Sequence, residues 1–284
     1  MIPAFVNPTA GSADEVHKAL RNAGLFDVIE VVPDRMTQAV RDAVKRGATR
    51  VVAAGGDGTI SAVAAAVAGT ETELAIVPGG TLNHFAKDHG IPTDLAQACA
   101  VATGGRVVPA DAAWVNGRLF LNTSSVGVYA RFVRVREGLE PRFGYHLSSL
   151  IAIVRTLLGV RPFRVAFETA QLQRPYLTPL VFVGVGEREL KLPRLGGRQE
   201  GGQSGLHVLI VRGRTRARLV ALAFAAAARG SRATSRTPHL DGFLVDHCTI
   251  EQRHSTVAID GEIVTLDSPL HYEIGRGALR LVVP

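Results

Sequence analysis

Cysteine and aromatic residues are scarce in this chain of 284 residues. Its two cysteines, Cys99 and Cys248, are far apart, which excludes a disulfide framework or a cysteine-rich zinc site and is typical of a reducing compartment. Aromatic residues make up 6% of the chain, and no nucleic-acid-binding motif accompanies them. We therefore expect no nucleic-acid partner.

Long uncharged apolar runs are also missing. None reaches the ~18 residues that a transmembrane helix needs. The N-terminal segment, MIPAFVNPTAGS, has neither a basic region nor an apolar core, so we expect no signal peptide. With 46% hydrophobic residues the chain is typical of a globular protein, and we expect it to be soluble and cytoplasmic.

Positive charge is in excess, with a formal net charge of +7. Seven arginines and no acidic residue lie between Arg212 and Arg236, around an apolar run at 219–228 that predicts a helix. Two interpretations stay open. This segment either lies against an anionic membrane face, placing the protein peripherally at the inner membrane, or is a core helix with solvated ends.

Two glycine-rich loops follow two short apolar runs. Residues 51–54 (VVAA) predict a buried strand that stops at Gly55-Gly56-Asp57-Gly58, and Thr59 is the expected cap of a helix over 60–68. Residues 74–77 predict a second strand, which ends at a Pro-Gly-Gly-Thr turn. Both loops are thus expected at the strand ends where an open parallel sheet binds its ligands.

The loops are suited to an anion. Glycine lets a bulky phosphate approach the backbone, and amides at a helix start favour negative charge. Asp57 is suited to hold a Mg²⁺ ion that contacts the phosphate; the alternative is a tight turn with a solvated aspartate. No G-x-x-x-x-G-K-[ST] motif is present, and Ser61 and Pro78 stand where a dinucleotide fingerprint needs a glycine and an acid.

Three ordered motifs remain: Asn7-Pro8-Thr9-Ala10-Gly11, Gly55 to Thr59, and Pro78-Gly79-Gly80-Thr81-Leu82-Asn83. With N-P-x-x-G, GGDGT and P-x-G-T-x-N in this order, the chain resembles the catalytic domain of diacylglycerol kinases, sphingosine kinases and bacterial lipid kinases. The resemblance implies that these loops hold ATP. The implied nucleotide-binding residues are Asn7, Pro8, Thr9, Gly11, Thr37, Gly55, Gly56, Asp57, Gly58, Thr59, Gly80, Thr81 and Asn83.

The resemblance also implies two catalytic residues. Asp57 would hold Mg²⁺, and Glu262 occupies the place of the general base in the family's D-G-E motif. Local sequence alone makes Asp260-Gly261 a hairpin turn between apolar residues. Thr37 is either the nucleotide contact that the family implies or an N-cap.

Alternating patterns predict an α/β fold: a Rossmann-like parallel sheet with helices on both faces over residues 1–105, then a β-rich acceptor-binding domain over 106–284. In the first part we expect strands at 3–6 and 28–32 and helices at 13–22, 37–46, 83–89 and 94–103. In the second, Asn116-Gly117 predicts a hairpin, residues 144–160 predict a helix, and strands are expected at 119–123, 165–169, 179–185, 206–211, 245–251 and 270–274.

Three features depart from the family pattern: His84, Ser204, and Val185-Gly186, which stands at a strand end where a more polar pair is expected. His84 follows Asn83 where the family commonly has aspartate; it either marks a subgroup or has a capping or packing role. Ser204 replaces the acid of the family's structural Mg²⁺ site, so we expect that site to be absent.

The sequence therefore predicts an ATP- and Mg²⁺-dependent kinase for a lipid hydroxyl, of the diacylglycerol type, acting at a membrane surface. Two alternatives stay open: a kinase for another lipid or a soluble alcohol, and a nucleotide-binding regulator without catalysis. The sequence does not indicate an oligomeric state.

Overall fold

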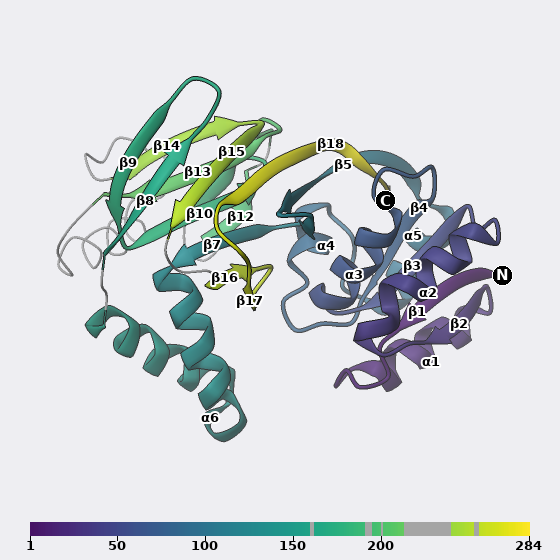
Figure 1. Ribbon diagram of the computed structural model, residues 1–284. Coiled ribbons are helices and arrows are strands. Elements are labelled where there is room, and N and C mark those ends of the chain that lie inside the picture. The colour runs from purple at the N-terminus through teal and green to yellow at the C-terminus, as the bar shows by residue number, and fades with distance from the viewer. Residues whose placement is uncertain (160–161, 191–194, 200, 213–239, 253–255) are drawn as a thin grey trace. The chain divides into compact units, whose positions relative to one another are not determined.

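The computed structural model describes residues 1–159, 162–190, 195–199, 201–212, 240–252 and 256–284 (Figure 1). Internal contacts divide the chain into two compact units. The first comprises residues 1–112 and 275–284, and the second residues 113–274. The last ten residues, which the sequence analysis assigned to the second domain, thus lie in the first unit, and a functional boundary after Gly105 stays a prediction. The predicted arginine-flanked helix at 219–228 lies outside the described residues.

A parallel sheet forms the centre of the first unit. Its strands are β1 (Ile2–Val6), β2 (Phe26–Glu30), β3 (Arg50–Gly55) and β4 (Glu73–Pro78), in the order β2-β1-β3-β4. The end of β18 (Leu270–Val283) extends this sheet by pairing with β4 in parallel. All four N-terminal strands were predicted, although β2 begins two residues before the predicted range of 28–32.

Helices cover both faces of this sheet (Figure 1). On one face α1 (Ala13–Ala23) and α5 (Leu95–Gly104) share an apolar core with alternate residues of β1, β3 and β4. The other face carries α2 (Pro33–Lys45) and α3 (Asp57–Val67), which pack on each other and on the strands. A short helix, α4 (His84–Asp88), follows β4. The predicted Rossmann-like architecture is confirmed.

Two predicted helix starts are wrong. The predicted helix at 37–46 begins at Pro33, because proline is preorganised for the first helical position, so Thr37 lies in the second turn and is no N-cap. The helix that Thr59 was expected to cap begins at Asp57, and the cap position belongs to Gly56 in extended conformation. Asp57 and Gly58, which follow Gly56, are therefore the first two residues of this helix.

Antiparallel strands make up most of the second unit. One sheet has the order β14-β13-β10-β7-β16-β17, and another group of strands runs β18-β15-β8-β9. The two share one apolar core, with Phe167, Val183, Ile250 and Tyr272 among its buried residues. The strands are β7 (Thr123–Gly127), β8 (Phe163–Glu168), β9 (Gln173–Thr178), β10 (Leu180–Val185), β13 (Leu206–Val211), β14 (Leu240–Val245), β15 (His247–Gln252), β16 (Thr256–Ile259) and β17 (Glu262–Thr265).

Four further strands lie within the described residues: the long β5 (Arg106–Val115) and the short β6 (Arg118–Phe120), β11 (Arg188–Leu190) and β12 (Leu195–Arg198). The predicted hairpin between β5 and β6 is confirmed, because Asn116 and Gly117 both have positive φ, at 47° and 77°. The strand predicted at 245–251 is wrong at its start, since β14 ends at Val245 and β15, in the other group of strands, begins at His247.

Helix α6 (Val128–Leu158) begins sixteen residues before the predicted range of 144–160. Gly144 interrupts it with a left-handed backbone, at φ 68° and ψ 171°. The sequence pattern thus found only the second of its two arms. No helix in the described ranges has the length and apolarity needed to span a bilayer.

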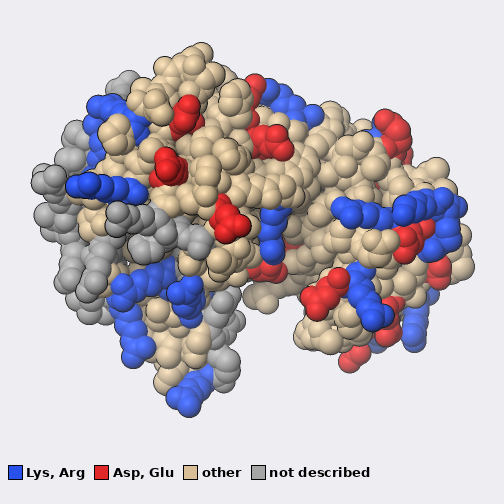
Figure 2. Space-filling view, in the orientation of Figure 1, with Lys and Arg blue, Asp and Glu red and all other residues tan. Residues whose placement is uncertain are grey.

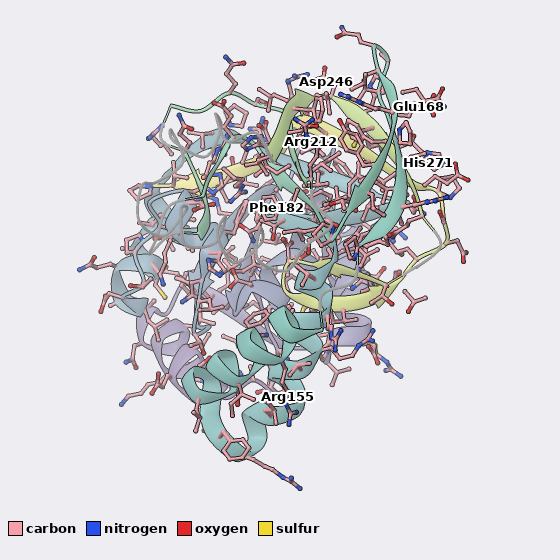
Figure 3. All side chains as sticks on the ribbon, turned by 90° about the vertical axis from the view of Figure 1, so that its left-hand side faces the viewer. Arg155, Glu168, Phe182, Arg212, Asp246 and His271 are labelled. Carbon is pink, nitrogen blue, oxygen red and sulfur yellow. The ribbon has the colours of Figure 1, made fainter. Side chains whose placement is uncertain are left out.

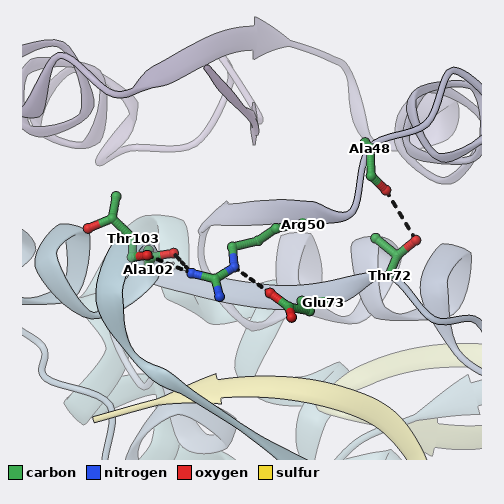
Figure 4. A network of polar contacts seen from close by, with 6 residues as sticks. All are labelled: Ala48, Arg50, Thr72, Glu73, Ala102 and Thr103. Atoms are coloured by element: carbon green, nitrogen blue, oxygen red, sulfur yellow. Dashed lines mark hydrogen bonds and ion pairs between the residues drawn. The ribbon is translucent and has the colours of Figure 1, made fainter.

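Arg50 connects the strands that carry the two glycine loops (Figure 4). Its Nε lies 2.7 Å from Oε2 of Glu73 on β4, and its Nη1 donates to the carbonyls of Ala102 and Thr103, at 2.9 and 2.8 Å, at the end of α5. The side chains of Arg50 and Glu73 are mostly buried. Arg50 therefore fixes β3, β4 and α5 to one another at the ends of the strands opposite the loops.

We expect Arg50→Ala to lower the free energy of unfolding by about 2 kcal/mol, because it leaves the mostly buried Glu73 carboxylate and two helix carbonyls without their donor. Urea unfolding would measure this. Arg280→Ala is the matched control, since Arg280 pairs at 3.2 Å with Glu71, which is 96% exposed, and its loss should change stability little. Equal effects of the two substitutions would contradict the bridging role of Arg50.

Candidate functional site

The two glycine loops leave the sheet side by side. Strands β3 and β4 pair in parallel register, with Ala54 opposite Val77 and Gly55 opposite Pro78. The amide of Gly79 continues this pairing by donating to the carbonyl of Gly55 at 2.9 Å. Because both chains turn at the same level, the GGDGT and PGGTLN segments form one surface at the carboxyl edge of the sheet.

Backbone contact between the loops requires glycine. A Cβ on Gly80 would lie 2.7 Å from Cα of Gly56 and 2.8 Å from Oδ1 of Asn83, and a Cβ on Gly79 would lie 2.4 Å from Cγ2 of Val16. Such distances are far inside van der Waals contact. The absent side chains thus let the second loop lie directly on the first.

Asn83 fixes the shape of the second loop. It is 5% exposed and has a left-handed backbone, at φ 50° and ψ 47°. Its Oδ1 accepts the amide of Gly80 at 2.9 Å, and its Nδ2 donates to the carbonyl of the same residue at 2.7 Å. Both ends of the Asn83 amide are thereby used within the loop, while its predicted contact with a nucleotide stays a prediction.

The N-terminal loop joins the same surface. Oδ1 of Asn7 accepts both the amide and the hydroxyl of Thr9, at 3.1 and 2.9 Å, which folds the Asn7-Pro8-Thr9 turn. The hydroxyl of Ser12 donates to the carbonyl of Gly79, linking this loop to the second glycine loop. Ser12 is not among the residues predicted from the sequence, although it immediately follows the N-P-x-x-G motif.

Asp57 is the first residue of α3 and is half-buried. One of its carboxylate oxygens, Oδ1, accepts the amide of Phe85 at 3.5 Å, which ties α3 to α4. The amides of Asp57, Gly58 and Thr59 lie in the first turn, where no acceptor exists within the helix. A carboxylate and a group of helix-start amides therefore stand at one edge of the loop surface.

A metal ion at this position would take most of its ligands from a bound phosphate group and from water, because the protein offers few. The described residues contain no cluster of three or more His, Cys, Asp or Glu side chains suited to a metal ion. Asp57 alone fits Mg²⁺ as one carboxylate ligand, because this ion retains waters and takes its remaining ligands from phosphate oxygens. The chemistry of the residues present is thus compatible with Mg²⁺ that arrives with a nucleotide.

Three other predicted residues have different surroundings. The hydroxyl of Thr37 donates to the carbonyl of Ala62 at 3.1 Å and so joins α2 to α3. Thr81 is exposed on the second loop. His84 is exposed at the first position of α4, where the cap is Asn83, so His84 is not the N-cap of this helix.

In the second unit, the predicted Asp-Gly turn is confirmed between β16 and β17, with φ 46° at Asp260 and 92° at Gly261. The Asp260 carboxylate turns inward and accepts the amides of Leu121, Asn122 and Thr123, at 2.8, 2.8 and 3.0 Å. It therefore fastens the hairpin to the segment between β6 and β7. The local sequence does not indicate this role, because the three amides lie almost 140 residues away.

Arg188 is the buried charge near Asp260. It is 4% exposed, and its Nε donates to the carbonyl of Val185 at 2.9 Å. Burial raises the pKa of Asp260, while the three backbone hydrogen bonds and the positive charge of Arg188 act in the opposite direction. The amides and the guanidinium thus compensate for the removal of this carboxylate from water.

Glu262 begins β17, two residues after Asp260. Its side chain is 62% exposed, and Oε2 lies 3.2 Å from Nη2 of Arg118, which is also exposed. The two acidic residues of the D-G-E motif thus differ in their environment: Asp260 is turned inward and Glu262 is accessible. Glu262 belongs to the second unit and Asp57 to the first, so their joint action stays a prediction.

The departure at Ser204 has a local consequence. Its hydroxyl oxygen is buried and has no hydrogen-bond partner within the described part of the chain. No carboxylate is supplied at this position. The expected loss of the family's structural Mg²⁺ site stays a prediction.

Comparison with known proteins gives a family match. Residues 2–115 match the model of the diacylglycerol kinase catalytic domain. A protein named probable lipid kinase YegS-like from Cronobacter sakazakii is 44% identical over 121 residues, and the diacylglycerol kinase of Bacillus subtilis is 37% identical over 136 residues. These alignments cover 40% and 46% of this chain and 40% and 45% of the relatives, so the chain spans less than half the length of the curated relatives it matches. The resemblance inferred from three motifs is confirmed.

Solved structures extend the likeness to the whole chain. A crystal structure described as a diacylglycerol kinase from Bacillus anthracis covers 100% of this chain and 96% of its own, with a TM-score of 0.70 and 20% identity. A second structure from the same organism has a TM-score of 0.76 and 23% identity. The second unit therefore shares its fold with these proteins, beyond the matched catalytic domain.

We expect Gly80→Ala to lower the free energy of unfolding by about 1–3 kcal/mol, because its Cβ would meet the backbone of Gly56. Thermal unfolding would measure the change. Gly104→Ala is the control, since a Cβ there has nothing within 4 Å and alanine is favoured in a helix. A Gly80→Ala protein as stable as the control would show that the loops do not touch.

We expect Asp260→Asn to lower the free energy of unfolding by about 3 kcal/mol. An amide nitrogen would replace a carboxylate oxygen that accepts backbone N–H groups, and the buried positive charge of Arg188 would lose a nearby negative charge. Glu262→Gln, in the same hairpin but exposed, should leave stability nearly unchanged. Urea unfolding of the two variants tests the contrast, and equal stabilities would refute the inward role of Asp260.

Proposed function

Because residues 2–115 match the catalytic domain of the diacylglycerol kinase family, we propose that this protein is a lipid kinase that uses ATP and Mg²⁺. The acceptor in this proposal is a lipid hydroxyl, with diacylglycerol the first candidate. The observation that carries the proposal is the single surface formed by the two glycine loops, with Asp57 and the first-turn amides of α3 at its edge.

In this proposal, backbone amides of the glycine loops and of the start of α3 bind the phosphate groups. Gly55, Gly56 and Gly80 carry no side chains that would keep a triphosphate away, and the amides of Asp57, Gly58 and Thr59 favour its negative charge. Asn83 and Ser12 hold the second loop in this shape through hydrogen bonds to the backbone of Gly80 and Gly79. Mg²⁺ would neutralise charge on the triphosphate, with Asp57 as its protein ligand.

Glu262 acts in the proposal as the general base. A lipid hydroxyl is a poor nucleophile at neutral pH, so a carboxylate within hydrogen-bond reach accepts its proton as the hydroxyl oxygen bonds to the γ-phosphorus and ADP departs. An exposed carboxylate at the start of β17 is accessible for this task.

The decisive experiment measures transfer of labelled γ-phosphate from ATP to a total lipid extract in the presence of Mg²⁺. We expect a labelled lipid with the native protein, and a loss of rate of about 10²- to 10⁴-fold with Glu262→Gln. ATP binding should remain. Glu168→Gln is the control, because Glu168 is an exposed glutamate of the same unit on β8 and should leave transfer unchanged.

Three outcomes would change the proposal. Equal rates for the native protein and Glu262→Gln would remove Glu262 as the base. Labelling of a soluble alcohol and of no lipid would replace the acceptor class. Binding of ATP without transfer to any acceptor would favour a nucleotide-binding regulator over an enzyme.

A further inference from the structure

Helix α6 is a hairpin of two helical arms. The arms span residues 128–143 and 145–158 and meet at Gly144, whose backbone is not helical. At the other end, Nη1 of Arg131 donates to the carbonyl of Gly159 at 2.6 Å, so the start of the first arm lies beside the end of the second. The turn at Gly144 is thus the far end, about 20 Å along the arms from that contact.

The hairpin has a base and a tip. Its base packs against β7, β16 and β17, and it extends away from these strands (Figure 1). In Figure 3, α6 with Arg155 lies at the opposite end of the second unit from Glu168 and His271 on the sheet strands. Val133 and Ala152 are buried between base and tip, so the arms have an apolar inner side of their own.

Two large apolar side chains are exposed at the tip. Phe143 and Leu147 stand on either side of Gly144 and are 48% and 47% exposed. The other described exposed hydrophobic residues lie elsewhere in the chain, at Met1, Leu25, Val32 and Leu244. Phe143 and Leu147 thus expose apolar surface on the same projecting turn.

Helix α6 carries an excess of positive charge, and one of its arginines lies at the tip. Helix α6 contains five arginines and two glutamates, and no lysine or aspartate. Arg134, Arg142 and Arg155 are exposed; Arg142 directly precedes Phe143 at the tip, whereas Arg134 and Arg155 lie nearer the base. Figure 2 shows arginine side chains gathered on the visible face of α6. Apolar side chains beside an exposed arginine, on a helix with excess positive charge, fit a surface that is anionic outside and apolar inside.

We propose that Arg142, Phe143 and Leu147 form a membrane-docking tip that inserts into the interface of an anionic lipid bilayer. The arginine stem can lie along the apolar region while its guanidinium remains among lipid phosphates. A protein partner fits less well, because a specific interface buries roughly 800 Å² on each side and this tip is a narrow projecting turn. The proposal extends the proposed lipid kinase function by assigning the surface through which it meets its acceptor, but docking itself needs no catalysis.

The first test is flotation of the full chain, without ATP, with vesicles of phosphatidylcholine and phosphatidylglycerol and with vesicles of phosphatidylcholine alone. We expect preference for the anionic vesicles and a partition at least about tenfold weaker for the double variant Phe143→Ser, Leu147→Ser. The matched control is Leu25→Ser with Val32→Ser, an apolar pair of the first unit that is 55% and 44% exposed. This control should bind as the native protein does.

The second test follows the tip itself. The chain has one tryptophan, Trp114, so Trp114→Phe with Phe143→Trp places the only indole at the tip. We expect its emission to shift to the blue with anionic vesicles and to be quenched by brominated lipids. We also expect Arg142→Glu to weaken binding and to reduce its dependence on salt.

Two results would overturn the proposal. One is a tip that takes no part in binding. It would show as native-like vesicle binding by the Phe143→Ser, Leu147→Ser variant, or as an indole at position 143 that remains in water while the protein is bound to vesicles. The other is unchanged vesicle binding together with conversion of an oligomer to a monomer in that variant, which would assign the tip to a second copy of the chain. Both are read without ATP, so they stay separate from failure of the kinase assay.

Discussion

The close approach of two backbones, at Gly56 and Gly80, is the constraint on which the first unit depends. Strands β3 and β4 bring the two loops to the same level, and neither loop could occupy its position if Gly80 carried a side chain. Asn83 and the Ser12 hydroxyl then hold the second loop from two sides. Segments far apart in the sequence thereby form one surface with helix-start amides and a carboxylate at its edge.

A different constraint organises the hairpin of the second unit. Asp260 uses its charge internally, on three amides near β6 and β7, with buried Arg188 close by. Glu262, two residues later, is exposed and paired only at the surface. One short motif thus combines an acid that fixes the turn with an acid that remains accessible. The inward acid fixes the backbone of the turn from which the outward one projects, as the role proposed for Glu262 requires.

Local signals explain what the sequence predicted. Strands β3 and β4 are short apolar runs that end at glycines, and Asn116-Gly117 satisfies the positive φ values of its turn by itself, so neither needs information from distant residues. The start of α6 was missed because charged and apolar residues mix there and Gly138 and Pro141 break the pattern. The start of α2 was missed because Pro33 was not taken as a first helical residue.

Long-range contacts explain most of what the sequence could not predict. Arg50 reaches the carbonyls of α5 more than fifty residues away, and the partners of Asp260 are almost 140 residues away. Nothing near these side chains in the sequence specifies such partners. The same holds for the exposure of Phe143 and Leu147, since an apolar residue on a helix ordinarily indicates a buried face.

The most direct test of the central claim, that the joined glycine loops bind ATP, is amide hydrogen exchange with and without ATP and Mg²⁺. The account predicts slower exchange of the amides at residues 55–59 and 79–83 in the complex, with little change in β8 and β9. Protection confined to other segments, while ATP is demonstrably bound, would contradict it and place the nucleotide elsewhere.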